Sequence, residues 1–191
     1  MNEVTMIRTF IAISVPERVK NNIEELQRQL KRGGGHLKWI RTESIHLTLK
    51  FLGDVEESKI DTIADSVHKA VSSQQPFIIS VSGTGAFPNI KRPRVLWAGI
   101  DEGKEILTSL ATGIDRACTA LGFKPEKRKF SAHLTIGRVK SSKNIQNTLN
   151  TMNSTDFEGG SFRAEEIQII KSELRPEGAK YTPLHTIKLE G

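Results

Sequence analysis

A short histidine-containing sequence occurs twice in this chain of 191 residues. Residues 46–49 read His-Leu-Thr-Leu, and residues 133–136 read His-Leu-Thr-Ile. Each copy follows a strand and helix pattern, and each precedes an amphipathic helix pattern after a short polar turn. We therefore expect a duplicated lobe, with the two His-x-Thr strands side by side about a local twofold axis.

The two copies have the pattern of half-buried strands, because successive side chains in a strand point to opposite faces. Alternation groups His46, Thr48 and Lys50 on one face of the first strand, and His133 with Thr135 on one face of the second. The opposite face of the first strand is apolar and consists of Ile45, Leu47, Leu49 and Phe51. Each strand thus buries one face and presents an imidazole beside a hydroxyl on the other.

An imidazole and a hydroxyl side by side suit a phosphate. With a pKa near about 6.5, one histidine can remove a proton from water or a hydroxyl while a second, protonated one protonates the departing oxygen. Threonine hydroxyls can donate hydrogen bonds to phosphate oxygens. One His-x-Thr alone is more often a half-exposed strand face, so the repeat carries the hypothesis that His46 and His133 act together. Thr48 and Thr135 would then bind the phosphate.

This chemistry requires no metal ion or other cofactor, and the sequence contains neither His-Glu-x-x-His nor paired Cys-x-x-Cys. Arg138 lies five residues after His133 and could pair with a phosphate oxygen. Strict alternation places it on the face opposite His133, and a bulge at Gly137 would return it to the site. Lys50 is the comparable residue of the first strand, and it could equally be a solvated charge at the rim.

The remaining pattern alternates helices with strands, which indicates an α+β protein. Strands are predicted over 9–15, 37–40, 44–53, 77–81, 94–100, 131–139, 165–172 and 184–189. Helices are predicted over 19–30, 57–71, 104–122 and 144–152. The Gly- and Pro-rich segment 82–93 is predicted to be a loop. Cys118 falls at helical spacing with apolar neighbours, which favours a buried filler over a nucleophile.

The composition is typical of a globular protein, with 37% apolar and 26% charged residues. A net charge of +6 favours acidic partners such as nucleic acid, although a generally basic surface explains it equally well. A single cysteine forms no internal disulfide and fits a reducing compartment. No apolar stretch is long enough to span a membrane, and the first residues lack a signal-type core, so we expect a cytoplasmic protein.

Several residues have two interpretations that the sequence leaves open. The basic segments 91–94 and 124–129 could guide an RNA backbone or form an ordinary soluble surface. Four aromatic residues are candidates for stacking on a terminal base, although the last two also fit core patterns: Trp39, Phe87, Trp97 and Phe130. The other histidines are interpreted as structural or exposed: His36, His68 and His185.

These segments resemble the two-histidine (2H) phosphoesterase superfamily, in particular the RNA 2′,3′-cyclic phosphodiesterases, also called LigT-like or 2′-5′ RNA ligases. The resemblance covers essentially the whole chain. It includes the opening strand at 8–13, the signatures at 38–53 and 130–138, an internal strand at 94–99 and the Lys-Ser-Glu-Leu at 171–174. No catalytic position departs from the family pattern.

The resemblance implies a bilobal, duplicated α+β fold with two antiparallel sheets flanking a central cleft and helices on the outer faces. Residues 1–191 would form one domain of two pseudo-symmetric lobes, with both termini in one lobe. The implied substrate is RNA with a 2′,3′-cyclic phosphate terminus, or a cyclic nucleotide, which is opened to a 2′-phosphate without a metal or cofactor. We expect a monomer that binds no membrane.

Residue by residue, the resemblance implies that His46 is the proton donor to the departing 3′ oxygen and that His133 is the proton acceptor that activates water. Thr48 and Thr135 would bind the phosphate, with Arg138 assisting. Reversal with a 5′-hydroxyl in place of water would join ends through a 2′-5′ linkage. Two alternatives stay open: a module that binds RNA ends without turnover, and the same chemistry on a small cyclic nucleotide. The loops at 83–94 and 122–129 would decide the substrate.

Overall fold

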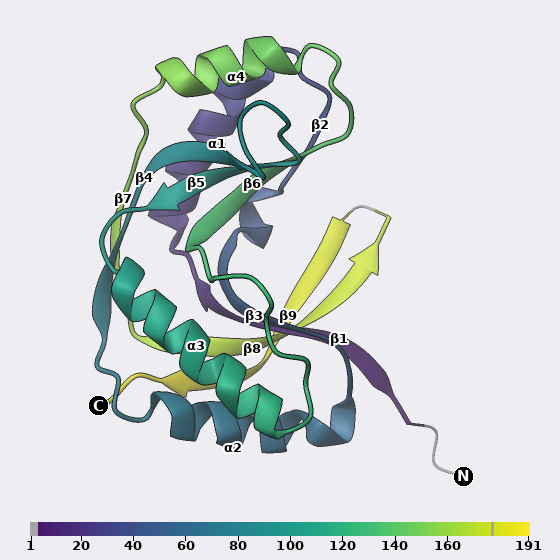
Figure 1. The fold of residues 1–191 in the computed structure, drawn as a ribbon, viewed down its shortest axis with the longest axis vertical. Coiled ribbons are helices and arrows are strands. Elements are labelled where there is room, and N and C mark those ends of the chain that lie inside the picture. The colour runs from purple at the N-terminus through teal and green to yellow at the C-terminus, as the bar shows by residue number, and fades with distance from the viewer. Residues whose placement is uncertain (1–3, 177) are drawn as a thin grey trace.

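The computed structural model describes residues 4–176 and 178–191 (Figure 1). In these residues, strands form a four-stranded antiparallel sheet, in the order β3-β1-β8-β9, and a five-stranded one, in the order β2-β6-β5-β4-β7. The strands are β1 (Met6–Ser14), β2 (Leu37–Trp39), β3 (His46–Glu56), β4 (Phe77–Phe87), β5 (Val95–Ile100), β6 (His133–Val139), β7 (Glu158–Ala164), β8 (Glu166–Arg175) and β9 (Gly178–Lys188). The helices are α1 (Glu17–Lys31), α2 (Ile60–Val71), α3 (Lys104–Ala120) and α4 (Ile145–Ser154), with 3₁₀ turns at Thr42–Ser44 and Glu57–Lys59.

The helices cover the outer sides of the two sheets. α2 and α3 pack on each other and against the four-stranded sheet, whereas α1 and α4 pack on each other and against the five-stranded sheet (Figure 1). α1 follows β1 in the chain but packs against β7, and α3 follows β5 but packs against β3. Each of these helices thus crosses to the other sheet, and the predicted α+β class with two antiparallel sheets and outer helices is confirmed.

Apolar side chains from both sheets and all four helices form one continuous core. α1 shows how the sequence builds it, because its buried residues recur at three- and four-residue spacing: Val19, Ile23, Leu26 and Leu30. The same cluster includes Ile11 of β1 and Leu96 of β5, which lie in different sheets. Strands from both ends of the chain, β1 and β9, belong to the four-stranded sheet. We propose on this basis that residues 1–191 form one bilobal domain.

Three strands differ clearly from the sequence prediction; one of them, β9, begins at Gly178 rather than at residue 184. β4 continues through 82–87, where glycine predicted a loop, because Gly85 lies opposite Trp97 and leaves room for the indole ring against the backbone. β7 was not predicted because Gly159 and Gly160 interrupt the alternation of side chains, and it pairs with β4 as an edge strand. The local sequence pattern therefore underestimates the length of strands in which a glycine lets a neighbouring side chain lie against the backbone.

Cys118 is buried in α3, as its spacing predicted. Burial raises the pKa of its thiol to about 11, so the thiolate is scarce at neutral pH and the side chain acts as a small apolar residue. No helix in the described residues is long and apolar enough to cross a membrane.

The shared core predicts that damage to one sheet destabilises the other. Ile11 is fully buried in the four-stranded sheet, whereas both tryptophans of the chain, Trp39 and Trp97, lie in the five-stranded sheet. We expect Ile11→Ala to lower the free energy of unfolding by about 2–5 kcal/mol. Urea unfolding followed by tryptophan fluorescence and by circular dichroism should give one shared, lowered midpoint. Met6→Ala, at an exposed position, is the control; separate midpoints for the two probes would contradict a single domain.

Candidate active site

The five residues that the sequence assigned to a phosphate all line one cleft between the two sheets. His46 and Thr48 come from β3, and His133, Thr135 and Arg138 come from β6. β3 and β6 belong to different sheets, yet they contact one another. The two His-x-Thr strands therefore converge, although the chemical role of each side chain stays a prediction.

Arg138 reaches the cleft because β6 contains one extra residue. In the β5–β6 ladder Trp97 lies opposite Thr135 and Leu96 lies opposite Gly137, so Ile136 has no partner. Such a bulge reverses the faces that the following side chains occupy. Arg138 thereby joins the face of His133, as the sequence suggested for a bulge at Gly137; the extra residue is the one immediately before that glycine.

β3 carries a bulge at the equivalent place, which the sequence prediction missed. In the β1–β3 ladder Ala12 lies opposite Thr48 and Ile11 lies opposite Lys50, so Leu49 has no partner. Phe51 therefore turns into the cleft, where the simple alternation predicted a buried apolar face. Both bulges fall three residues after a histidine, which extends the duplication from the sequence to the backbone.

Phe51 is therefore the residue of β3 that matches Arg138 of β6. Phe51 lies five residues after His46, and Arg138 lies five residues after His133. Pairing Arg138 with Lys50 on sequence grounds was wrong, because Lys50 occupies the position of Gly137. At this one position of the duplicated scaffold, β6 supplies a cation to the cleft and β3 supplies an aromatic ring.

Lys50 is neither a phosphate ligand nor a solvated rim charge, because its side chain is only 1% exposed. Its Nζ donates hydrogen bonds to Asp115 Oδ1 at 2.6 Å and to the Lys124 carbonyl at 3.1 Å. Burial by itself would raise the pKa of the Asp115 carboxyl. The hydrogen bond and charge of Lys50 act in the opposite direction, as does the hydrogen bond from the Glu126 amide. Together they outweigh burial, so the pKa of Asp115 is lowered. The pair is therefore an ion pair at neutral pH.

Both histidines are held in the same tautomer. His46 Nδ1 lies 2.8 Å from the Ser44 carbonyl, and His133 Nδ1 lies 2.7 Å from the Ser131 carbonyl. Because a carbonyl oxygen only accepts, Nδ1 carries the hydrogen in each ring. Nε2 is therefore the atom left to exchange a proton: it accepts one when the ring is neutral and donates one when the ring is charged.

Aromatic side chains pack around each imidazole. His46 stacks on Phe10, with ring centroids 4.5 Å apart, and meets the edge-on ring of Tyr181 at 5.1 Å. His133 meets the edge-on ring of Phe87 at 4.9 Å. Phe10 and Tyr181 were missed by the sequence analysis, although alternation along β1 places Phe10 on the cleft face. Of the aromatic residues proposed to stack on a base, Phe87 lines the cleft, and Trp39 and Phe130 pack against the core instead.

This packing favours the neutral form of both rings. Burial lowers the pKa of His46 to about 4, although the hydrogen bond to the Ser44 carbonyl acts in the opposite direction. Burial also lowers the pKa of His133; the hydrogen bond to Ser131 opposes this, and the charge of Arg138 adds to it. Both imidazoles are therefore neutral at pH 7 in the free protein, and an anion in the cleft would favour their protonation.

The cleft is electrostatically suited to an anion. Among the residues that the structure describes, the side chains that line it include Arg8 and Arg138 and no carboxylate. Arg8 was not singled out from the sequence, although it shares the cleft face of β1 with Phe10. Within residues 4–176 and 178–191, no group of three or more His, Cys, Asp or Glu side chains is arranged to hold a metal ion.

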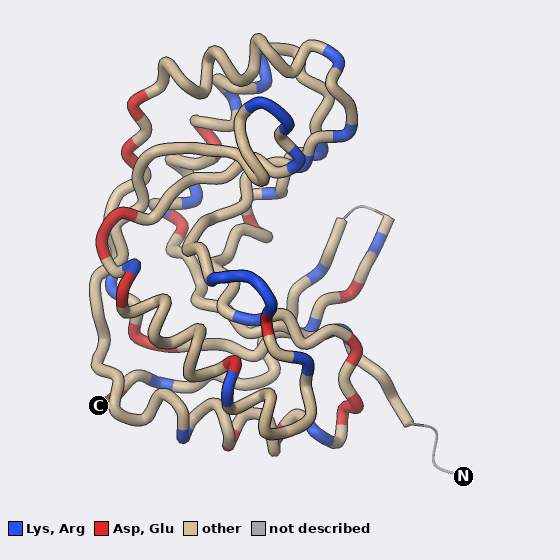
Figure 2. Tube along the Cα trace, in the orientation of Figure 1, with Lys and Arg blue, Asp and Glu red and all other residues tan. Residues whose placement is uncertain are grey.

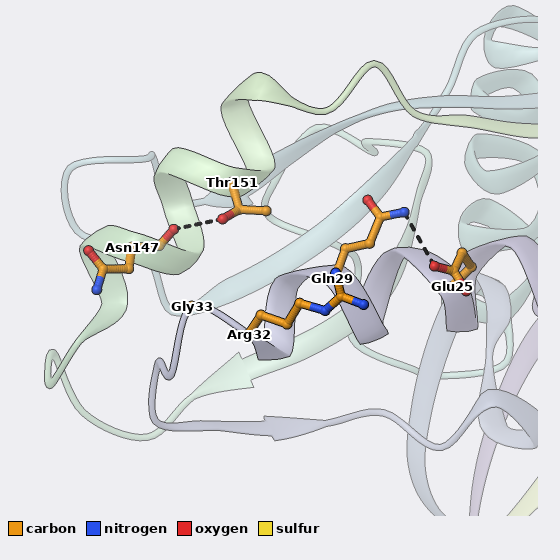
Figure 3. Close-up of a pocket in the computed structure, with 6 residues that line it drawn as sticks. All are labelled: Glu25, Gln29, Arg32, Gly33, Asn147 and Thr151. Atoms are coloured by element: carbon orange, nitrogen blue, oxygen red, sulfur yellow. Dashed lines mark hydrogen bonds between the residues drawn. The ribbon is translucent and has the colours of Figure 1, made fainter.

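A second hollow lies between α1 and α4, away from both histidines (Figure 3). Two of its polar side chains bond within their own helices: Gln29 Nε2 donates to Glu25 Oε1 at 3.4 Å, and Thr151 Oγ1 donates to the Asn147 carbonyl at 3.1 Å. It contains none of the residues that the sequence singled out.

Comparison with protein families gives a match to the family described as LigT like Phosphoesterase, over residues 13–97 and 99–181. Each segment contains one His-x-Thr sequence. A protein of Methanothermobacter thermautotrophicus named RNA 2′,3′-cyclic phosphodiesterase is 35% identical over 184 residues, covering 96% of this chain and 99% of its own. A protein of the same name from Methanocaldococcus jannaschii is 37% identical, covering 92% of this chain and 96% of its own.

Solved structures show the same fold. The crystal structure of TT0787 of Thermus thermophilus matches with a TM-score of 0.79 and 27% identity, over 97% of this chain and 99% of that one. E. coli LigT complexed with 3′-AMP matches with a TM-score of 0.80 and 21% identity, over 98% of this chain and 100% of that one. The second likeness, at lower identity, concerns the fold alone.

The burial of Lys50 predicts a structural role. Lys50→Ala removes one partner of a buried ion pair, and we expect it to lower the free energy of unfolding by about 3 kcal/mol in urea titrations. The matched control is Lys59→Ala, whose pair with Glu56 is exposed and worth less than about 1 kcal/mol. Equal, small losses in the two variants would contradict the assignment.

Proposed function

The chain belongs to the LigT-like phosphoesterase family and is a phosphoesterase, and we propose that it hydrolyses RNA 2′,3′-cyclic phosphodiester ends to 2′-phosphomonoesters. The observation that carries the proposal is the pair of imidazoles, from two strands far apart in the chain, that line one cleft with Nε2 available in each ring. The names of the archaeal relatives supply the substrate class.

In this reaction His133 is the base and His46 is the acid. Nε2 of His133 takes a proton from water as the water oxygen bonds to phosphorus. The bond between phosphorus and the 3′ oxygen breaks, and Nε2 of His46 donates its proton to that oxygen. The products are a 2′-phosphate and a 3′-hydroxyl, and proton exchange with solvent restores both rings.

The surroundings of the two rings affect these roles differently. Burial, with the charge of Arg138 adding to it, lowers the pKa of His133, which keeps that ring neutral as a base requires. His46 must be protonated to act as an acid, yet burial lowers its pKa to about 4. The negative charge of a bound phosphodiester would oppose that effect by pairing with the imidazolium. Substrate binding therefore helps to charge the acid.

The remaining side chains have matching tasks. Thr48 and Thr135 lie two residues from their histidines and donate hydrogen bonds to the nonbridging phosphate oxygens, and Arg138 neutralises their charge. Phe51 and Tyr181 supply aromatic rings to the cleft, which suit stacking with a base. Arg8 and Arg138 supply one cation from each sheet for the phosphate.

The same site would join two RNA ends through a 2′-5′ linkage if the 5′-hydroxyl of a second RNA replaced water. His133 would then take the proton of that hydroxyl while its oxygen bonds to phosphorus, and His46 would protonate the departing 3′ oxygen. In the opposite direction the roles exchange: His46 takes the proton of the attacking 3′-hydroxyl, and His133 donates a proton to the departing 5′ oxygen. Water at its bulk concentration favours hydrolysis in dilute solution. Incubation of cyclic-phosphate and 5′-hydroxyl oligonucleotides at high concentration, followed by a search for 2′-5′-linked product, tests ligation separately; no linked product would reject it.

The acid–base proposal predicts that His46→Ala and His133→Ala each lower kcat by about 10²–10⁴-fold, because one proton transfer is lost in each. The assay measures opening of a 2′,3′-cyclic nucleotide and a cyclic-ended oligonucleotide in the presence of a chelator. His185→Ala is the matched control, because His185 lies on β9 in contact with Asp61, outside the cleft. Full activity in either cleft variant would reject the mechanism, and tight end-specific binding without product would favour the binding module.

The pH dependence of kcat/KM reports the groups of the free enzyme. Since the pKa of each histidine is lowered from 6.5, we expect a bell-shaped profile with its maximum below pH 6.5 and a decline toward pH 8. Arg138→Gln removes a charge that lowers the pKa of His133, so it should move the maximum to higher pH. A rate that simply climbs through neutrality would contradict the assigned acid.

A further inference from the structure

Four cations lie close together in the connection between α3 and β6. We define the basic loop as residues 124–129, which contain Lys124, Lys127, Arg128 and Lys129 together with one carboxylate, Glu126. All of these side chains are exposed. We propose that the basic loop binds the backbone phosphates of the RNA nucleotides that precede the cyclic end. The inference rests on the proposed function and deepens it, because it makes an RNA strand, rather than a mononucleotide, the preferred substrate.

The position of the basic loop supports this role. Lys129 lies four residues before His133, and at most about 3.8 Å per residue its Cα is within about 15 Å of the histidine Cα. The chain between them includes Ser131, whose carbonyl accepts the hydrogen bond from His133. Figure 2 shows residues 127–129 as a continuous blue stretch in the middle of the view, where the chain crosses from α3 to β6, with a red segment between it and a separate blue segment nearer α3. An RNA strand whose end occupies the cleft has its next phosphates within this reach.

The buried ion pair holds the basic loop in a defined conformation. Lys50 Nζ donates to the Lys124 carbonyl at 3.1 Å, and Asp115 Oδ1 accepts from the Glu126 amide at 3.1 Å. The backbone is therefore fixed from two sides, whereas the side chains that carry charge remain in solvent. A loop already ordered before binding loses less conformational entropy when it meets an RNA strand.

The charge of the loop selects a polyanion. Asp115 and Lys50 neutralise each other, so the pair subtracts nothing from the surplus of three positive charges on the exposed loop. The cleft itself contributes Arg8 and Arg138 for the terminal phosphate. A cyclic mononucleotide presents one phosphate, which those arginines reach without the loop. Only a longer RNA presents further phosphates, so the loop should affect the two substrates differently.

The test compares a cyclic mononucleotide with a ten-nucleotide RNA that ends in a 2′,3′-cyclic phosphate. In the triple variant Lys127→Gln, Arg128→Gln, Lys129→Gln we expect kcat/KM for the RNA to fall by about tenfold at 0.1 M salt. The slope of log kcat/KM against log salt for the RNA should flatten by about 2, since each phosphate contact on a single strand contributes about 0.7. The mononucleotide should be hydrolysed within about twofold of the unchanged protein.

The control variant removes three exposed lysines, from α2, α3 and β9, that do not line the cleft: Lys69→Gln, Lys104→Gln, Lys188→Gln. An equal loss in this variant would mean that overall charge alone attracts RNA, and would overturn the proposal. An equal loss on both substrates in the loop variant would mean that the loop only shapes His133, which also overturns it. A ratio of kcat/KM for the RNA to kcat/KM for the mononucleotide that is the same in the loop variant as in the unchanged protein would also overturn the proposal.

Failure of the loop proposal remains distinct from failure of the proposed function. Turnover of the cyclic mononucleotide by the unchanged protein reports the proposed function alone, and the RNA-to-mononucleotide ratio reports the loop. If neither substrate is turned over, fluorescence anisotropy with a 3′-phosphorylated single-stranded RNA measures binding directly. Weaker binding in the loop variant than in the control supports the loop as an RNA site, and equal binding overturns it.

Discussion

One extra residue after each histidine decides which side chains reach the cleft. Leu49 and Ile136 have no partner on the neighbouring strand, so the side chains that follow each of them occupy the opposite face from the one that simple alternation predicts. Beyond these points Phe51 and Arg138 face the cleft. Lys50 faces the core instead, where it meets Asp115. The same backbone feature thus completes the site on one face and anchors the basic loop on the other.

A duplicated scaffold here produces an asymmetric site. The His-x-Thr sequences, the Nδ1 hydrogen bonds and the bulges all repeat, so the two imidazoles present equivalent atoms to the cleft. Their neighbours differ, because β6 supplies Arg138 where β3 supplies Phe51. That difference gives the two rings different surroundings, as the proposed division into a base and an acid requires. Sharing one phosphate between two halves also requires the lobes to hold a fixed relation, which the continuous core and the crossed helices provide.

Burial lowers the pKa of both histidines, and a negative group in the cleft would oppose that effect. The aromatic rings that exclude water from His46 make its charged form costly unless such a group is present. In the proposed reaction, binding of the phosphodiester and protonation of His46 would therefore be linked. Arg8 and Arg138 would provide the fixed positive charge that attracts the phosphate.

The sequence by itself determined the fold class, most strands and all four helices, and five of the polar residues that line the cleft, because periodicity and a repeated motif are local properties. It did not determine the length of β4 or the existence of β7, since glycines in strands such as Gly85 are read locally as turns, and it did not determine where β9 begins. It also misassigned Lys50 and overlooked Arg8, Phe10, Phe51 and Tyr181. A bulge is defined only by the pairing of two strands, and a cleft is defined only by the meeting of two sheets. Which face a residue occupies after such a bulge, and which distant ring packs against it, is therefore settled by tertiary structure alone.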